Sequence, residues 1–217
     1  MKGSWVRTPA RSQQKLCNYC RVFLFYILLR LIFVSLVLVM QKSLISIFIV
    51  YFIVISKQLI FDFSRDIDIS SWKVIDDVVM GGESSGNFII NTEGNAVFYG
   101  KVSLQNNGGF SSVRHQFSQK SINSATKIKV RLKGDGNDYQ LRIKKSKNDY
   151  YSYLSTFQTN NSWEIIEINL SEMQPKFRGK ALSLENFSAN SFEEIAFLIG
   201  NKKAQDFRLE IDKIYLE

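Results

Sequence analysis

The stretch at 72–86, WKVIDDVVMGGESSG, holds the residues of this chain that are best suited to chemistry. Two adjacent carboxylates, Asp76 and Asp77, stand inside an apolar run, and a glycine pair and two serines follow. Three interpretations are open: a pair of catalytic acids, a phosphate-binding loop, or a strand that ends in a turn with a demanding backbone.

The catalytic pair requires both carboxylates to face one substrate. We expect a strand over 72–80, and successive side chains of a strand point to opposite faces. Asp76 and Asp77 would then lie on opposite faces, which argues against a cooperating pair.

The phosphate loop fails on sequence. Residues 81–86 fit G-x-x-x-x-G, but such a loop continues with Lys and Ser or Thr, whereas Asn87 and Phe88 follow here. The G-x-G-x-x-G fingerprint is also missing, so we expect no nucleotide and no other cofactor. The structural interpretation is favoured, with an aspartate at the strand end accepting the N–H groups of a glycine turn. A partly buried carboxylate would need a cationic partner, for which Arg114 and Arg178 are the candidates.

The other chemistry-bearing residues form no recognisable catalytic set. His115 is the single histidine, and in 110–117 it shares a strand face with Val113 and Phe117, so we expect it to be packed. A Ser-His-Asp triad would depend wholly on it, and no G-x-S-x-G elbow is present. We therefore expect no enzyme and no metal site, although one structural calcium ion stays open. The acids considered for it, which lack the EF-hand spacing, are Asp62, Asp66 and Asp68.

An aromatic-rich stretch follows further along the chain. Aromatics at alternate strand positions are mostly core, with a carbohydrate- or protein-binding platform as the alternative. Its members are Tyr150, Tyr151, Tyr153, Phe157 and Trp163.

The charge of the chain is unevenly distributed. The formal net charge is +8, but residues 1–60 hold eight of the 28 Lys and Arg and none of the 20 Asp and Glu. Residues 61–217 are therefore formally neutral, which argues against nucleic acid as a partner, since its binders carry basic charge on the folded domain. Both cysteines, Cys17 and Cys20, also precede residue 61, and a single CxxC is weak evidence for a metal site.

Two apolar runs, 22–39 and 43–56, precede the polar part of the chain. The second is short for a membrane span and suits the core of a signal peptide, with Met40, Gln41 and Lys42 as its basic start. We expect 40–58 to be a signal peptide or membrane anchor and 1–39 to be an over-extended gene start. The protein would be exported or membrane-anchored through this segment. A location on the cytoplasmic face of the membrane is kept as an alternative. The alternative is a membrane hairpin of 22–39 and 43–60.

From residue 61 onward the patterns are those of strands. Residues 127–133, KIKVRLK, alternate charged and apolar side chains, a turn follows, and 139–144 alternate again. These two segments predict a β-hairpin. In 195–200 a buried strand competes with a helix that 191–194 would cap. We expect an antiparallel β-sandwich or barrel, with further strands at 72–80, 87–91, 96–104, 110–117, 150–158, 163–170, 195–200 and 207–216.

Several motifs together resemble one known family. They are WKVIDDVVMGGESSG at 72–86, FYGKVSLQNNGGFSSVR at 98–114, KGDGNDY at 133–139, YLSTF at 153–157, FRG at 177–179 and FLIGNKK at 197–203. In order and spacing they resemble the family of the 30-kDa complex I intermediate-associated protein across nearly all of 61–217. The resemblance implies a galactose-binding-like jelly-roll β-sandwich. It also implies kinship with eukaryotic assembly factors that chaperone intermediates of respiratory complex I and are not known catalysts.

The resemblance also singles out polar residues, as turn-formers and a charged binding or structural cluster rather than an active site. These are Asp76, Asp77, Ser84, Asn107, Arg114, Asp135, Tyr139, Arg178 and Lys202. The resulting hypothesis is a non-enzymatic module that binds protein partners, with subunits of a membrane complex as candidates, and that contacts a membrane through its N-terminal segment alone. The alternative is an exported carbohydrate-binding module.

Overall fold

The computed structural model describes residue 23 and residues 25–43, 57–64 and 68–217. The chain divides into two compact units, Met1–Ser56 and Lys57–Glu217. In the first unit, Phe25–Ser43 form an exposed helix with a mean hydropathy of 1.9. This helix is long and apolar enough to cross a membrane, and a signal sequence near an N-terminus has the same properties. Most of the apolar run expected at 43–56 lies outside the described residues.

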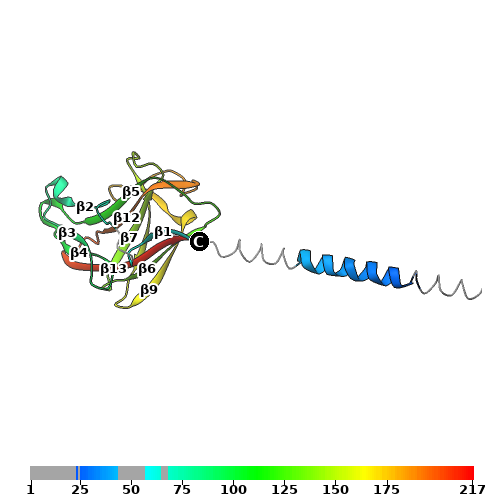
Figure 1. Ribbon diagram of the computed structural model, residues 1–217. Coiled ribbons are helices and arrows are strands. Elements are labelled where there is room, and N and C mark those ends of the chain that lie inside the picture. Colours follow the sequence, from blue (N-terminus) through cyan, green and yellow to red (C-terminus); the bar gives the residue numbers. More distant parts are fainter. Residues whose placement is uncertain (1–22, 24, 44–56, 65–67) are drawn as a thin grey trace, which may run out of the picture. The chain divides into compact units, whose positions relative to one another are not determined.

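The second unit is a sandwich of two antiparallel sheets, which confirms the expected fold class (Figure 1). The first sheet has the order β3-β4-β13-β6-β9, and β1 also pairs with β13. Its strands are β1 (Gln58–Asp62), β3 (Ser85–Ile90), β4 (Ala96–Val102), β6 (Lys127–Lys133), β9 (Trp163–Asn169) and β13 (Gln205–Leu216).

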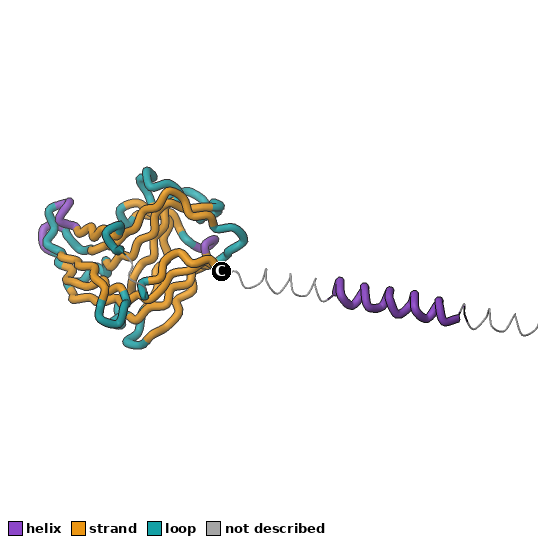
Figure 2. The backbone as a smooth tube through the Cα atoms, viewed as in Figure 1, coloured by secondary structure: helices purple, strands orange, loops and turns teal. Residues whose placement is uncertain are grey.

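The second sheet has the order β11-β10-β8-β7-β12-β5-β2. Its strands are β2 (Trp72–Asp76), β5 (Ser111–Ser121), β7 (Asp138–Lys144), β8 (Ser152–Gln158), β10 (Gln174–Phe177), β11 (Lys180–Ala181) and β12 (Ser191–Ile199). Loops join the strands (Figure 2), with short 3-10 turns at η1 (Asp77–Met80), η2 (Gln105–Asn107) and η3 (Leu170–Glu172).

The core lies between the two sheets and is built by alternation along the strands. In β6 the side chains of Ile128, Val130 and Leu132 are fully buried, while Lys129 and Arg131 between them are partly exposed. In β7 every second side chain, beginning at Tyr139, is likewise buried. The period-2 pattern of the sequence therefore identified both strands and their inner faces.

The predicted hairpin of 127–133 and 139–144 is wrong. β6 pairs with β13 and β9, whereas β7 pairs with β12 and β8 in the other sheet. The turn at 134–137 therefore crosses from one sheet to the other. Alternation shows that a strand has one buried face, but it does not identify the neighbouring strand, and two facing sheets satisfy it equally well.

Other strand boundaries also differ from expectation. The strand predicted at 72–80 ends at Asp76, because Asp77–Met80 turn into η1 and Gly81 follows with φ of 90°. Residues 191–199 form strand β12, so the helical alternative for this segment is wrong. The membrane hairpin is wrong in its last residues, since Gln58–Asp62 form β1 against β13.

Candidate functional site

Asp77 lies at the centre of the turn that the sequence singled out. Its side chain is 1% exposed although it is charged. The carboxylate accepts hydrogen bonds from the backbone N–H of Ser84 at 2.9 Å and of Phe110 at 3.1 Å, and from the N–H of Gly109 and the hydroxyl of Ser84. It therefore joins three chain segments: η1, the loop before β3, and the loop before β5.

These donors also explain the ionisation of Asp77. Burial by itself would raise the pKa of this carboxyl, but the hydrogen bonds from Ser84, Gly109 and Phe110 outweigh it and hold the pKa below its ordinary value. Asp77 is thus a buried anion neutralised by dipoles rather than by a cation.

Glycines make this close approach possible. A Cβ at Gly108 would lie 2.6 Å from Asp77 Oδ2, and a Cβ at Gly82 would overlap the other carboxylate oxygen. Asn107, the residue before Gly108, takes a φ of 60°. This conformation turns the chain so that the N–H groups of Gly109 and Phe110 face Asp77.

Asp76 serves a different pair of contacts. It accepts the N–H of Gly86 at 2.9 Å and the hydroxyl of Ser111, so it ties the end of β2 to β3 and β5. Asp76 and Asp77 therefore act on separate sets of donors, and neither carboxylate is left free to work on a substrate with the other.

The predicted arginine partner of Asp77 is wrong. Among the described residues, no ion pair or hydrogen bond joins Asp77 to Arg114 or Arg178. Arg114 lies 3.9 Å from Glu194 on the second sheet. Arg178 occupies the tight turn after β10 with φ of 47°, and its guanidinium lies over the ring of Phe177. The sequence predicted that Asp77 accepts N–H groups of its own turn, as it does from Ser84, but not that amides of the distant loop at Gly109 and Phe110 would take the place of an arginine.

Asp135 and Tyr139 form a second, separate group. Asp135 accepts the Tyr139 hydroxyl at 3.1 Å and the backbone N–H of Arg208 at 2.8 Å. Burial, and then the negative charge of Asp135, raise the pKa of Tyr139. The pair fixes the turn that crosses between the sheets. The polar residues of the family pattern are therefore distributed over several places and do not form one cluster.

The 3-10 turn η1 presents apolar side chains to solvent. Val78, Val79 and Met80 are 60%, 73% and 59% exposed. We call these three residues the η1 tip. The tip is held at its base by the buried Asp77, whose backbone carbonyl also accepts the N–H of Gly82 at 3.0 Å.

His115 is packed, as its sequence context predicted. Its ring stacks on Trp72 at 5.1 Å between centroids and meets Phe61 and Phe117 at 5.3 Å. Burial lowers the pKa of His115, while a backbone group of Ser71 acts in the opposite sense. A neutral, ring-packed histidine of this kind contributes to the core and does not serve a Ser-His-Asp triad.

The aromatic stretch divides between core and surface. Phe157 belongs to the core, and Trp163 lies under the guanidinium of Arg131. Tyr150 is 65% exposed and meets the ring of Phe177 edge-on at 5.3 Å. Tyr153 packs against the core, whereas Tyr150, Tyr151 and Trp163 do not belong to it, so the expectation that these aromatics are mostly core is wrong.

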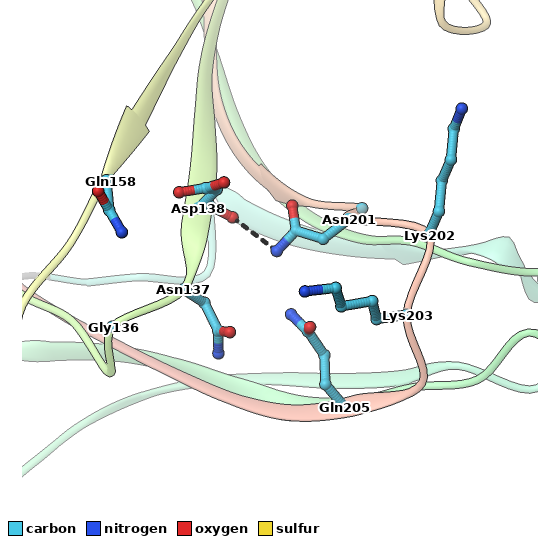
Figure 3. Close-up of a pocket in the computed structure, with 9 residues that line it drawn as sticks. Gly136, Asn137, Asp138, Gln158, Asn201, Lys202, Lys203 and Gln205 are labelled. Carbon is cyan, nitrogen blue, oxygen red and sulfur yellow. Dashed lines mark hydrogen bonds between the residues drawn. The ribbon is translucent and has the colours of Figure 1, made fainter.

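A polar pocket of about 470 Å³ lies where the β6–β7 turn and the β12–β13 loop meet (Figure 3). Lys203 points across it toward Asn137, while Lys202 points away. Asn201 donates to the backbone carbonyl of Asp138 at 3.0 Å, and the amide nitrogen of Gln205 is buried without a partner. Of the residues singled out by the family pattern, Lys202 belongs to this place.

Sequence reasoning missed a basic group on the outer face of the second sheet. Arg142 of β7 hydrogen-bonds to Gln140 at 2.7 and 3.0 Å, and no ion pair is recorded for it among the described residues. Burial, together with the positive charge of Arg114, lowers the pKa of Arg142 to about 10. The signal lay in the alternation of β7, which places Arg142 opposite the core. The net charge of the sheet face, however, also depends on the residues of the neighbouring strands, and the sequence alone does not give the order of the strands.

Metal binding finds no support in the part of the chain that the structure describes. No group of three His, Cys, Asp or Glu side chains gathers there in a way that could hold an ion. Asp62 and Asp68 instead accept hydrogen bonds from Ser64 and Ser70.

The fold is shared with known binding modules. A family 11 carbohydrate-binding module from Clostridium thermocellum, in complex with a beta-1,3-1,4-mixed-linked tetrasaccharide, matches with a TM-score of 0.56 at 17% identity, over 74% of this chain and 94% of that one. The family 11 module of a cellulosomal cellulase of Clostridium thermocellum matches with a TM-score of 0.56 at 15% identity, over the same shares. No curated protein matches the chain. The chain therefore has the β-sandwich fold of these two modules.

The particular family follows from the sequence itself. Residues 61–211 match the family described as Complex I intermediate-associated protein 30. This match covers more than half of the chain, so the chain belongs to that family, as the motifs predicted.

Proposed function

We propose that this protein is a non-enzymatic binding module for protein partners, and that it assists the assembly of a membrane complex in the manner of a chaperone. The η1 tip carries this proposal. Three consecutive aliphatic side chains are exposed there by 59% or more, on a turn that the chain holds in place with a buried charge.

The chemistry of the tip favours protein over sugar. Burying apolar surface on a partner contributes roughly 25 cal/mol per Å², and Val and Met side chains offer such surface without polar groups. Methionine also adapts to irregular partner surfaces. Because Asp77 fixes the base of the turn, less conformational entropy is lost when the tip is covered.

Family membership supports the class of partner. The family description names association with an intermediate of complex I, which is a membrane complex. The apolar helix Phe25–Ser43 supports work at a membrane, because its length and hydropathy suit a membrane-spanning segment.

Crosslinking followed by affinity purification tests this function. The full chain, carrying a C-terminal tag, is compared with the variant V78S/V79S/M80S. A matched control, I165S/L184S, removes exposed apolar side chains elsewhere, since Ile165 and Leu184 are 53% and 49% exposed.

We expect subunits of one membrane complex to be recovered with the wild type and the control, and at least tenfold less with the tip variant. Equal recovery by all three proteins, or no reproducible subunit with any of them, would contradict the proposal.

Carbohydrate binding is the second candidate, and one observation favours it. Tyr150 and Phe177, 65% and 37% exposed, place two rings side by side on the surface. Aromatic rings of this kind can stack on sugars. The mixed-linked tetrasaccharide of the structural neighbour is a suitable first probe, followed by a glycan array. Binding that Tyr150→Ala abolishes would establish this function, whereas an array without signal would remove it.

We further propose that residues 40–58 export the protein or anchor it to a membrane, with 61–217 as the binding domain. The basic start at Lys42, the apolar run and Ser56 fit a signal peptide. N-terminal sequencing of the native protein tests this, with a start soon after Ser56 expected for export. An N-terminus upstream of residue 40 in a soluble native protein would contradict the proposal.

A further inference from the structure

The outer face of the second sheet carries more positive than negative charge. Across its centre, β7, β12, β5 and β2 stand side by side, and the cross-strand register aligns Arg142, Ala196, Arg114 and Lys73 in one row. The adjacent row consists of Lys144, Glu194 and Gln116. Within the described residues of these two rows, four cations face a single carboxylate.

That carboxylate, Glu194, already accepts a hydrogen bond within the fold. Glu194 is 3% exposed and accepts a hydrogen bond from Gln116 at 2.6 Å. Arg114 and Lys144 lie 3.9 and 4.0 Å from the other oxygen, beyond hydrogen-bond distance. One charge at such distances compensates part of the positive charge and leaves most of it.

The two arginines are short of acceptors. The Nε of Arg114 is buried and has no hydrogen-bond partner, and the side chain of Arg142 is bound to the neutral amide of Gln140. Between them stands Ala196, which is outside the core cluster and yet only 3% exposed. Burial and the positive charge of Arg114 also lower the pKa of Arg142. The contribution of Arg114 indicates that the two cations are close together.

We infer that the outer face of the second sheet, at Arg114 and Arg142, binds carboxylates of an acidic segment of the partner protein. This inference rests on the proposed function, since it names the chemistry of the partner. Guanidinium groups bind carboxylates with two parallel hydrogen bonds, and the side chain of Arg114 is 29% exposed, so a ligand carboxylate can reach the outer part of this side chain. The two rows carry no aromatic side chain among the described residues, so they offer a sugar ring nothing to stack on.

A labelled ten-residue glutamate peptide is the direct probe. Its binding to the full chain in detergent is measured by fluorescence anisotropy, with a ten-residue glutamine peptide as reference. The variant R114Q/R142Q is compared with K101Q/K180Q, which removes the same charge at two exposed lysines away from the two rows.

We expect the glutamate peptide to bind the wild type at least tenfold more tightly than the glutamine peptide, and to lose at least tenfold in affinity in R114Q/R142Q. The control should stay within about twofold of the wild type. R114K/R142K keeps the charge but not the two-pronged geometry, and should bind at an intermediate level. Raising the salt from 50 to 300 mM should weaken binding, since part of the attraction is screened.

Folding of the variants is checked separately. Because Arg142 is charged in an unfavourable setting, Arg142→Met, which keeps much of the apolar stem, should melt no lower than the wild type. A large fall in melting temperature would show that Arg142 is a structural cation, and would overturn the inference.

Other results of the binding and crosslinking experiments would also overturn the inference. Equal loss of affinity in the control, or tighter binding of inorganic phosphate or an oligogalacturonate than of the peptide, would overturn the acidic protein segment as the ligand. If the peptide fails to bind while the tip variant still loses its crosslinked subunits, the inference fails and the proposed function stands. If crosslinking fails as well, both fall.

Discussion

Asp77 is a charged side chain whose whole hydrogen-bonding capacity is used within the fold. Two amides from the loop before β5 and both donors of Ser84 converge on it. An unpaired buried charge would cost several kcal/mol, so these donors are what makes the turn stable. At this position the sequence correctly predicted that the carboxylate accepts N–H groups of its own turn, and incorrectly predicted an arginine partner.

Asp77→Asn should destabilise the fold by about 2–3 kcal/mol at pH 7, because the amide group places donors against buried backbone donors. Asp76→Asn should cost about 1 kcal/mol, since Asp76 is less buried and accepts two hydrogen bonds. Thermal unfolding of the full chain in detergent measures both. Similar small effects of the two substitutions would contradict the central role of Asp77.

The same residue predicts a pH dependence. The pKa of Asp77 is lower in the folded state than in the unfolded state. Its contribution to stability is therefore fully present above the unfolded value of about 3.9, and is lost as the pH falls through the folded value. The gap in melting temperature between wild type and Asp77→Asn should narrow from pH 7 to pH 3, and a constant gap would be evidence against ionised Asp77 as its cause.

At the scale of elements, the 3-10 turn η1 and the loop 105–109 form one unit around Asp77. Gly108 has an ordinary φ of −67°, so a side chain there would cause no backbone strain. Its hydrogen is needed because a Cβ would meet Asp77 Oδ2 at 2.6 Å.

Gly108→Ala should therefore destabilise the fold by about 1–3 kcal/mol through crowding of the carboxylate. In a double-mutant cycle with Asp77→Asn we expect a coupling of at least about 0.5 kcal/mol. Gly136→Ala, where a Cβ meets nothing within 4 Å, should be additive with the same substitution. Additivity at both glycines would show that Gly108 acts independently of Asp77.

The sequence alone predicted where strands β6 and β7 lie, but not which strands they pair with. Alternation in β6 and β7 located the strands and their buried faces, because one side of each packs on the core. It could not show that the two strands belong to different sheets, since pairing depends on contacts that are distant in the sequence. The basic rows of the second sheet were hidden for the same reason. They combine side chains from four strands whose order no local pattern encodes.

At the scale of the whole molecule, the sandwich has its own core. The buried cluster runs from Phe63 to Leu216, and Ile60 and Phe61 of β1 pack against it. β1 pairs with β13 over Gln58 to Asp62, so the sandwich begins before the first residue of the family match.

Removal of residues 1–56 should leave the melting temperature of the sandwich within about 2 °C of the full chain, because all members of that cluster lie beyond residue 56. Removal of residues 1–62 should lower it by several degrees, since the pairing of β1 and the packing of Phe61 are lost. Differential scanning fluorimetry of the two truncated proteins measures this. A large loss on removing 1–56 alone would contradict an independent sandwich.

The most direct test of the central claim places a photo-crosslinking amino acid at Val79, in the η1 tip, in the native cell. A matched position at Lys101, an exposed residue of β4, serves as the control. We predict that irradiation yields a covalent adduct between residue 79 and a subunit of one membrane complex, and no such adduct from residue 101. Adducts of the same proteins from both positions, or none from residue 79, would contradict a protein-binding module that uses this tip.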